Sequence, residues 1–328
     1  MYIPPFTITD EILNLVAEIC SHLARIEMLL GSGQPEPLLR KKNRILTIHS
    51  SLAIEQNTLS LQQVTDVING KHVLGHPREI QEVKNAMDAY DLMTQLDAFK
   101  EKDLLRAHGL MMKDLVQNAG NYRQEGIGVF DGNGTCLHMA PPPLRVPELM
   151  GDLFEWVKKS KAHPLVNSCV FHYEFEFIHP FIDGNGRMGR YWQTMLLSRW
   201  NPVLGWLPVE NIVRENQEGY YQAIAKSDAA GESTVFIEFM LKCLYETVIR
   251  NEKQNEVTNK VTNKVTNKTA LQVLRLLQEN GHITRKELSE RTGLSDSGIK
   301  KILNSLRVEG LIERIGANKN GYWKVKAL

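Results

Sequence analysis

The sequence predicts a mostly α-helical fold that is interrupted by one small β-hairpin and followed by a separate C-terminal domain of three helices and two strands. Three observations support this prediction. Apolar residues recur at three- and four-residue spacings over most of residues 10–250, as they do in amphipathic helices. A glycine-rich stretch at residues 120–143 interrupts that spacing, and three copies of Val-Thr-Asn-Lys at residues 257–268 divide the helical part from residues 269–328.

The helical spacing is clearest in two stretches of the first domain. Within residues 10–101 it is carried by Ile12, Leu13, Val16, Ile19 and Leu23, and later by Val83, Met87, Tyr90 and Leu92. It resumes over residues 146–250, with a break around residues 200–208. Between the two stretches, apolar runs at 127–130 and 136–139 flank Asp131-Gly132-Asn133-Gly134, a pattern that indicates a hairpin.

Composition narrows the class of protein without deciding the function. The 328 residues are 42% hydrophobic and 23% charged, which is ordinary for a globular chain of about two domains at ~150 residues each. A net charge of +1 gives no overall argument for a nucleic acid or a membrane partner. No apolar run approaches the ~20 residues of a transmembrane helix, the N-terminus lacks a signal-peptide pattern, and the four cysteines are scattered. We expect a cytoplasmic protein without a membrane partner.

The Val-Thr-Asn-Lys repeat predicts a polar linker at residues 251–268. Threonine, asparagine and valine are weak helix formers, and the repeat has too few apolar residues to build a core. A regular extension of the preceding helix is the less favoured alternative. The predicted domains are therefore residues 1–250, a linker at 251–268, and a small domain at 269–328.

Residues 269–328 predict a winged helix-turn-helix domain. A helix over 269–277 is followed by a capping box at Thr284 and Glu287, a helix over 296–309, and strands at 311–315 and 322–325. Residues 270–328 contain 11 Lys or Arg against 6 Asp or Glu, an excess that suits phosphate contacts. Polar residues are expected on the exposed face of the third helix: Ser295, Ser297, Lys300, Lys301 and Asn304. DNA binding and protein contacts both remain open for this domain.

The stretch from His179 to Arg190 contains the residues suited to phosphate chemistry. A buried helix ends at His179, a glycine-rich loop follows, and a second helix opens with Arg187 and Arg190. Such a loop exposes backbone N–H groups at the positive end of the helix, which is a natural anion site, and the two arginines can bind phosphate oxygens. Asp183 is a hard oxygen ligand suited to magnesium, and His179 can accept a proton near neutral pH. A second copy of Asp-Gly-Asn-Gly, at residues 131–134, lacks the histidine and the arginines, and we interpret it as a turn.

The same stretch carries a family resemblance. The residues from His179 to Arg190, His-Pro-Phe-Ile-Asp-Gly-Asn-Gly-Arg-Met-Gly-Arg, match the HxFxDGNGRxxR signature of Fic-domain proteins at every defined position. The resemblance covers roughly residues 45–250. It implies a Fic-type helical bundle whose hairpin forms a flap that pairs with the backbone of a target protein, although a purely structural hairpin remains the alternative. It also implies an adenylyltransferase, which transfers AMP from ATP to a Ser, Thr or Tyr hydroxyl of that target.

The resemblance also implies roles for single residues. His179 would take the proton from the attacking hydroxyl, and Asp183 would hold Mg²⁺. The anion hole and the phosphate sites would be formed by Gly184, Asn185, Gly186, Arg187 and Arg190. Tyr220 and Tyr221 resemble the adenine-side tyrosine pair, with core packing as the alternative, and Asp228 stands where many relatives carry Asn.

An upstream segment resembles the inhibitory helix motif of the same family, [S/T]xxxE[G/N]. Ser51 and Glu55 are in register with it, whereas Gln56 departs from the usual Gly or Asn. The implied mechanism is self-inhibition, in which Glu55 forms an ion pair with Arg190 and removes a phosphate contact. Taken without the resemblance, Glu55 would be interpreted first as a solvated helical charge.

Two functions from different classes follow. The first is an ATP-dependent adenylyltransferase that modifies a target protein, which could be the chain itself, and that carries a DNA- or protein-binding module at residues 269–328. The second is a nucleotide-sensing transcription regulator that has little turnover and binds DNA through the winged helix. A homodimer is left open in both.

Overall fold

A computed structural model describes residues 2–30, 37–130, 136–264, 268–308, 310–316 and 321–325. The described residues fall into two compact units, one within Met1–Ala24 and Gly33–Ile249 and the other within Arg25–Ser32 and Arg250–Leu328. Among these residues, no helix is both long and apolar enough to cross a membrane.

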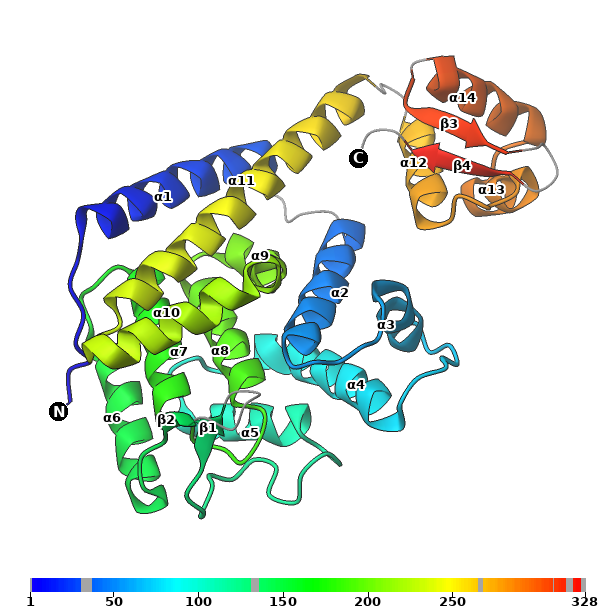
Figure 1. The fold of residues 1–328 in the computed structure, drawn as a ribbon. Helices are drawn as coiled ribbons and strands as arrows, with labels where there is room; N and C mark the ends of the chain where they lie inside the picture. Colours follow the sequence, from blue (N-terminus) through cyan, green and yellow to red (C-terminus); the bar gives the residue numbers. More distant parts are fainter. Residues whose placement is uncertain are drawn as a thin grey trace. The chain divides into compact units, whose positions relative to one another are not determined.

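The structure is mostly helical, as the sequence predicts (Figure 1). Its α-helices are α1 (Asp10–Leu30), α2 (Pro37–Ile54), α3 (Leu61–Ile68), α4 (Pro77–Leu92), α5 (Glu101–Met111), α6 (Val146–Lys159), α7 (Pro164–Ile178), α8 (Asn185–Trp200), α9 (Val209–Glu215), α10 (Gln217–Ala230), α11 (Thr234–Lys264), α12 (Lys268–Glu279), α13 (Arg285–Thr292) and α14 (Asp296–Val308). Short 3₁₀ helices span Met93–Gln95, Pro143–Arg145 and Pro202–Trp206. The strands are β1 (Gly128–Phe130), β2 (Cys136–Met139), β3 (Ile312–Ile315) and β4 (Tyr322–Val325).

Helices α7 and α8 pack side by side at the centre of the first unit (Figure 1). Buried residues occur on every side of both helices, which is expected only when other helices surround them. Phe177, which the sequence places in a buried helix, is nevertheless 39% exposed. The loop that joins α7 to α8 is therefore anchored at both ends in buried helices.

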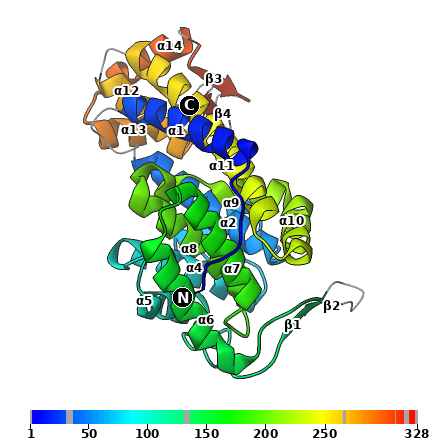
Figure 2. The same ribbon diagram turned by 90° about the vertical axis from the view of Figure 1, so that its left-hand side faces the viewer.

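The predicted hairpin is confirmed. Strands β1 and β2 pair antiparallel, with Gly128 opposite Met139 and an irregularity between Val129 and Phe130. The turn predicted at residues 131–134 lies outside the described residues. Figure 2 shows β1 and β2 extending away from the helices of the first unit.

The second unit has the order of elements of a winged helix-turn-helix domain. Helices α12, α13 and α14 precede the antiparallel pair β3–β4, in which Ile312 lies opposite Val325. The predicted capping box is present, because Thr284 and Glu287 exchange side-chain and backbone hydrogen bonds at the start of α13. Its core is formed by Ala270, Val273, Leu274, Leu277, Ile283, Leu288, Ile299, Leu303, Leu306, Leu311 and Ile312.

The expectation of a non-helical linker is corrected by the structure, because α11 continues from Thr234 to Lys264 and so includes most of the Val-Thr-Asn-Lys repeat. Once the packed first turns of a helix have formed, each further residue needs no new nucleation. Weak helix formers cost at most ~0.7 kcal/mol each relative to alanine, so the repeat can extend a helix that it could not start. That residues 1–250 and 269–328 form separate domains stays a prediction.

Candidate active site

His179 caps the C-terminal end of α7 and turns the chain into the loop. Its backbone is left-handed, with φ 50° and ψ 61°, a conformation that is uncommon for a residue with a Cβ. Its Nδ1 lies 3.3 Å from the carbonyl oxygen of Glu176. Because a carbonyl can only accept, Nδ1 carries the hydrogen and Nε2 is the basic nitrogen of the neutral ring. The helix end thus fixes the tautomer that a general base needs.

The loop takes its shape from Asn185 and Gly184. Oδ1 of Asn185 accepts from the Phe181 N–H at 2.9 Å, and its Nδ2 donates to the Phe181 carbonyl at 2.8 Å. Gly184 has φ 85°, and a Cβ there would lie 2.6 Å from Sδ of Met112. The side-chain amide of Asn185 therefore holds the two ends of the loop together. Because this amide is already paired, an anion at the start of α8 would be bound by backbone N–H groups and not by the Asn185 side chain.

His108 on α5 contacts the same loop and supports it. Its Nδ1 accepts from the Gly120 N–H at 2.8 Å, so Nε2 carries the hydrogen and donates to the Asp183 carbonyl oxygen at 3.1 Å. The ring stacks on Phe181 with 3.6 Å between centroids. Burial lowers the pKa of His108 to about 4, which keeps the imidazole neutral in this role.

Two buried guanidinium groups stand at the positive end of α8. Arg187 and Arg190 are 4% and 3% exposed, and they lie on the first two turns of the helix, where the dipole already favours an anion. Nη2 of Arg187 donates to Oδ1 of Asp183 at 3.0 Å. Burying two cations next to a helix N-terminus favours a polyanionic ligand.

The carboxylate of Glu55 occupies part of this positive site. Nη2 of Arg190 donates to Oε1 of Glu55 at 2.7 Å and to the Ser51 carbonyl at 3.1 Å, while its Nε donates to Oγ of Ser51 at 3.2 Å. A Cβ at Gly186 would collide with the same Glu55 oxygen. Gln56, which departs from the Gly or Asn of the inhibitory motif, has φ 68°. This is the left-handed region that Gly and Asn adopt most readily, so the departure preserves the backbone at a cost in strain.

Helix α4 contributes two charged residues that close a ring with the loop. Arg78 donates to Oδ2 of Asp183 at 3.0 Å, and Glu82 lies 3.6 Å from both Arg78 and Arg187. Glu82 also accepts from Nδ2 of Asn57 at 2.8 Å. The ring of two arginines and two carboxylates therefore links Asp183 to the segment that follows Glu55.

Among the described residues, no group of three or more His, Cys, Asp or Glu side chains is placed to hold a metal ion. Asp183 fits magnesium in another way, because Mg²⁺ is commonly held by one or two carboxylates together with substrate phosphates. Its side chain is 38% exposed, and each of its two oxygens accepts from an arginine. A metal ion at Asp183 would have to share or replace these contacts.

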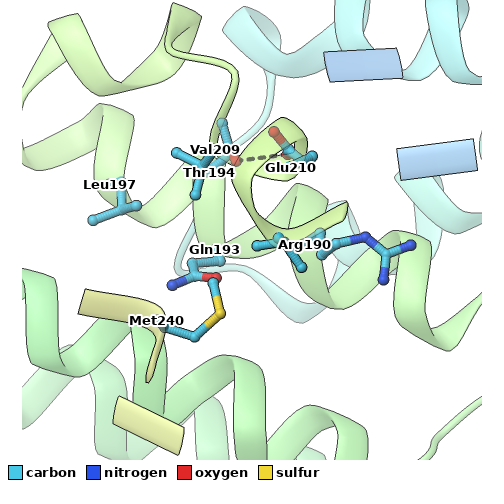
Figure 3. A pocket seen from close by; sticks show the side chains of 8 residues that line it. Arg190, Gln193, Thr194, Leu197, Val209, Glu210 and Met240 are labelled. Atoms are coloured by element: carbon cyan, nitrogen blue, oxygen red, sulfur yellow. Dashed lines mark hydrogen bonds between the residues drawn. The ribbon is translucent and has the colours of Figure 1, made fainter. Parts of the chain in front are cut away.

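A small cavity behind Arg190 is too small for a nucleotide. It has about 10 Å³ of space, on the scale of one water molecule. Figure 3 shows the Arg190 guanidinium pointing away from it, and Thr194 donating to Oε1 of Glu210. Burial raises the pKa of Glu210, and its Oε2 has no hydrogen-bond partner among the described residues.

Comparison with known proteins identifies the family. The family model described as "Fic/DOC family" matches residues 95–197. A crystal structure of a Fic family protein from Desulfovibrio desulfuricans G20 superposes with a TM-score of 0.77, at 45% sequence identity over 99% of this chain and 98% of that chain. The chain belongs to the Fic family. A second family model, described as "Winged helix-turn-helix DNA-binding", matches residues 266–313.

Curated Fic relatives share a smaller part of their length. The protein adenylyltransferase Fic of Aedes aegypti is 28% identical over 220 residues, which cover 63% of this chain and 42% of the relative. The protein of the same name from Drosophila erecta is 29% identical over 212 residues, which cover 61% and 40%. The chain thus spans less than half the length of either of these two relatives.

The two tyrosines that the Fic resemblance assigns to adenine lie in different surroundings. Tyr220 is 2% exposed, and its hydroxyl lies 3.1 Å from Nε2 of the buried His172. Tyr221 is 48% exposed, and its hydroxyl lies 3.5 Å from the carbonyl oxygen of Ile54, the last residue of α2. Because Tyr220 offers no exposed ring face, the prediction of an adenine contact narrows to Tyr221. Asp228 accepts from the hydroxyl of Tyr173 at 2.7 Å.

Sequence reasoning did not assign a role to four residues around the Fic loop: Arg78, Glu82, His108 and Arg123. Arg123 stands at the end of Gly120-Asn121-Tyr122-Arg123, just before the predicted hairpin. The other three belong to amphipathic helices, where a charged or polar residue is ordinarily a solvated one. Only the packing of α4 and α5 against α8 reveals what they contact.

Proposed function

We propose that this chain is a protein adenylyltransferase that transfers AMP from ATP to a Ser, Thr or Tyr hydroxyl of a target protein. One observation carries the proposal: a histidine with Nε2 as its basic nitrogen stands at the entrance of a loop whose far end presents Arg187 and Arg190 at a helix N-terminus. Proton acceptance and phosphate binding are thereby joined within twelve residues.

In the proposed reaction, the target hydroxyl attacks the α-phosphorus of ATP and gives its proton to Nε2 of His179. The new bond joins the hydroxyl oxygen to AMP, and the bond to pyrophosphate breaks. Arg187, Arg190 and the N–H groups at the start of α8 would neutralise the leaving pyrophosphate. Asp183 would hold Mg²⁺, which supplies further positive charge to the phosphates.

We further propose that the resting state is autoinhibited. The support is the contact of the Glu55 carboxylate with Arg190 and its position against Gly186. With this carboxylate in place, the γ-phosphate of ATP loses the Arg190 guanidinium and meets a negative charge instead. Release of α2 from this position would restore the phosphate site.

Incubation with ATP labelled at the α-phosphate tests both parts of the proposal. We expect covalent label on protein with Glu55→Gly, weaker label with wild type, and none with the double variant Glu55→Gly and His179→Ala. Label that persists without His179 would contradict the assigned base. Tight nucleotide binding without any transfer would contradict the enzyme and support the alternative below.

The alternative is a nucleotide-sensing transcription regulator with little turnover. Two observations favour it: the match of residues 266–313 to a DNA-binding winged helix-turn-helix, and the exposed polar face of α14, which includes Lys300, Lys301 and Asn304. DNA binding through this face is also compatible with the enzyme, so the label experiment and a DNA-binding assay answer separate questions.

A further inference from the structure

Arg123 lies between α5 and β1 and is 2% exposed. Its side chain donates four hydrogen bonds. Nε donates to the His179 carbonyl at 2.8 Å, Nη1 to the Glu125 carbonyl at 2.8 Å, and Nη2 to the carbonyls of Pro141 and Ile178 at 2.5 and 3.3 Å. In addition, its backbone N–H donates to the Pro180 carbonyl at 2.9 Å.

Every one of these acceptors is a backbone oxygen. Burial lowers the pKa of Arg123, and a buried cation without a carboxylate partner is tolerated only when its N–H groups are satisfied by other acceptors. A guanidinium has five N–H donors in a fixed plane, whereas a lysine ammonium has three on a single atom. The site is therefore built around the fork of an arginine.

The acceptors come from two segments that are far apart in the sequence. Residues 178–180 are the end of α7 and the start of the loop, including the left-handed His179. Glu125 and Pro141 lie on the two sides of the β1–β2 hairpin, one before β1 and the other after β2. One guanidinium thus fixes the backbone of His179 relative to both arms of the hairpin.

We propose that Arg123 is a positioning residue that sets the catalytic histidine relative to the hairpin. This inference rests on the proposed function, in which His179 takes the proton of the target hydroxyl, and on the flap role that the Fic resemblance implies for the hairpin. No hydrogen bond of Arg123 reaches α8, which carries the phosphate contacts. Arg123 therefore governs the transfer step and leaves nucleotide binding to Arg187, Arg190 and the start of α8.

The kinetic test compares Arg123→Lys and Arg123→Ala in the Glu55→Gly background. We expect the affinity for a non-hydrolysable ATP analogue to change by less than about twofold, while the transfer rate of the alanine variant falls about 100-fold, the scale reported for a misplacement of ~1 Å. Added methylguanidinium should restore part of the rate of Arg123→Ala. The matched control is Arg145→Ala, because Arg145 is 58% exposed and pairs with Glu148. The transfer rate of this variant should equal that of the Glu55→Gly background and should not change when methylguanidinium is added.

A second readout needs no turnover and separates this inference from the proposed function. In Arg123→Lys, amide hydrogen exchange should quicken both at residues 176–182 and in the segments around 125 and 141, with the rest of the first unit unchanged. Quickening in only one of these segments would overturn the inference, even if the chain transfers AMP. Parallel losses of nucleotide affinity, transfer rate and thermal stability would also overturn it, because they would mark a general structural role. Absence of transfer in Glu55→Gly alone would count against the proposed function and leave the exchange result to decide this inference.

Discussion

Glu55 packs its carboxylate against Gly186 so closely that a methyl group on Gly186 would collide with Oε1. The same oxygen accepts a hydrogen bond from Arg190 at 2.7 Å. One carboxylate oxygen therefore meets both an arginine and the first turn of α8, the two features that would bind the terminal phosphate of ATP. A negative group already lies where a negative ligand would bind.

Removing this carboxylate is expected to raise auto-adenylylation. A charge-assisted hydrogen bond is worth ~1.5–3 kcal/mol, so both Glu55→Gly and Glu55→Gln should raise the rate roughly 10- to 150-fold. The glutamine variant keeps the size of the side chain and isolates the charge. The label on the chain, measured with α-labelled ATP, checks the prediction, and Glu148→Gln on α6 is the surface control. No increase with either variant would contradict autoinhibition by Glu55.

Arg78 is expected to compete with a metal ion for Asp183. Its Nη2 lies 3.0 Å from Oδ2 of Asp183, and its side chain is 50% exposed. Exposed ion pairs are typically worth ~0.2–1 kcal/mol, so Arg78→Gln should raise the affinity for Mn²⁺ by up to about fivefold. The measurement is Mn²⁺ binding by electron paramagnetic resonance, in the Glu55→Gly background with a non-hydrolysable ATP analogue. Weaker Mn²⁺ binding by Arg78→Gln would instead indicate that Arg78 helps to bind the nucleotide.

The two neighbouring tyrosines are expected to respond differently to substitution. An exposed aromatic face that stacks on a base contributes ~0.5–1.5 kcal/mol, so Tyr221→Ala should weaken binding of the ATP analogue roughly fivefold without lowering the melting temperature. Tyr220→Phe removes one buried hydrogen bond, worth ~1 kcal/mol. It should lower stability and leave nucleotide affinity unchanged. Isothermal titration and thermal unfolding of both variants check this, and the opposite pattern would return Tyr220 to the binding site.

The loop from His179 to Arg190 could be singled out in the sequence because its candidate residues are close together in the chain. Twelve residues include His179, Asp183, Arg187 and Arg190, and the glycines between them indicate a tight loop. Arg123 and Arg78 contact the same loop from 55 and more positions away in the sequence. The local sequence does not show what either arginine contacts, so only tertiary packing reveals these contacts.

Two further differences have physical causes. The polar repeat was expected to break the helix because its residues have low helix propensity, but propagation from the packed start of α11 outweighs that local preference through Lys264. Gln56 was recognised as a departure from the inhibitory motif, and its φ of 68° explains why the position favours Gly or Asn. The motif reports a backbone conformation there, and not a side-chain contact.

Glu174 is expected to make the chain less stable as the pH rises. Its residue is 4% exposed, its Oε1 accepts from the Tyr2 hydroxyl at 3.4 Å, and burial raises its pKa from 4.5 to about 7. Above pH 4.5 the unfolded chain releases this proton while the folded chain retains it to about pH 7. The unfolded state then binds fewer protons, so stability falls across this window, by about 2 kcal/mol between pH 5.5 and pH 8.

Urea unfolding of wild type and Glu174→Gln at both pH values checks this prediction. The glutamine can still accept from Tyr2 but has no proton to lose. The variant should therefore gain about 2 kcal/mol on wild type as the pH rises from 5.5 to 8. The exposed-site control Glu148→Gln should follow wild type, and parallel curves for wild type and Glu174→Gln would contradict the raised pKa.

The winged helix-turn-helix domain is expected to bind duplex DNA through α14. Lys300 and Lys301 are exposed on this helix, whereas Ile299, Leu303 and Leu306 on its other face are buried in the domain core. Each lysine that neutralises a phosphate releases a counterion, so the slope of log K against log salt changes by ~0.9 per contact. Replacing both lysines with alanine should make the slope shallower by about 1.8 and weaken binding at all sequences alike. Fluorescence anisotropy of the full chain over a salt series measures this, with Lys100→Ala on the first unit as the control. A steep slope that the double variant leaves unchanged would place the DNA contact elsewhere, and the absence of salt-dependent binding would assign the domain to protein contacts.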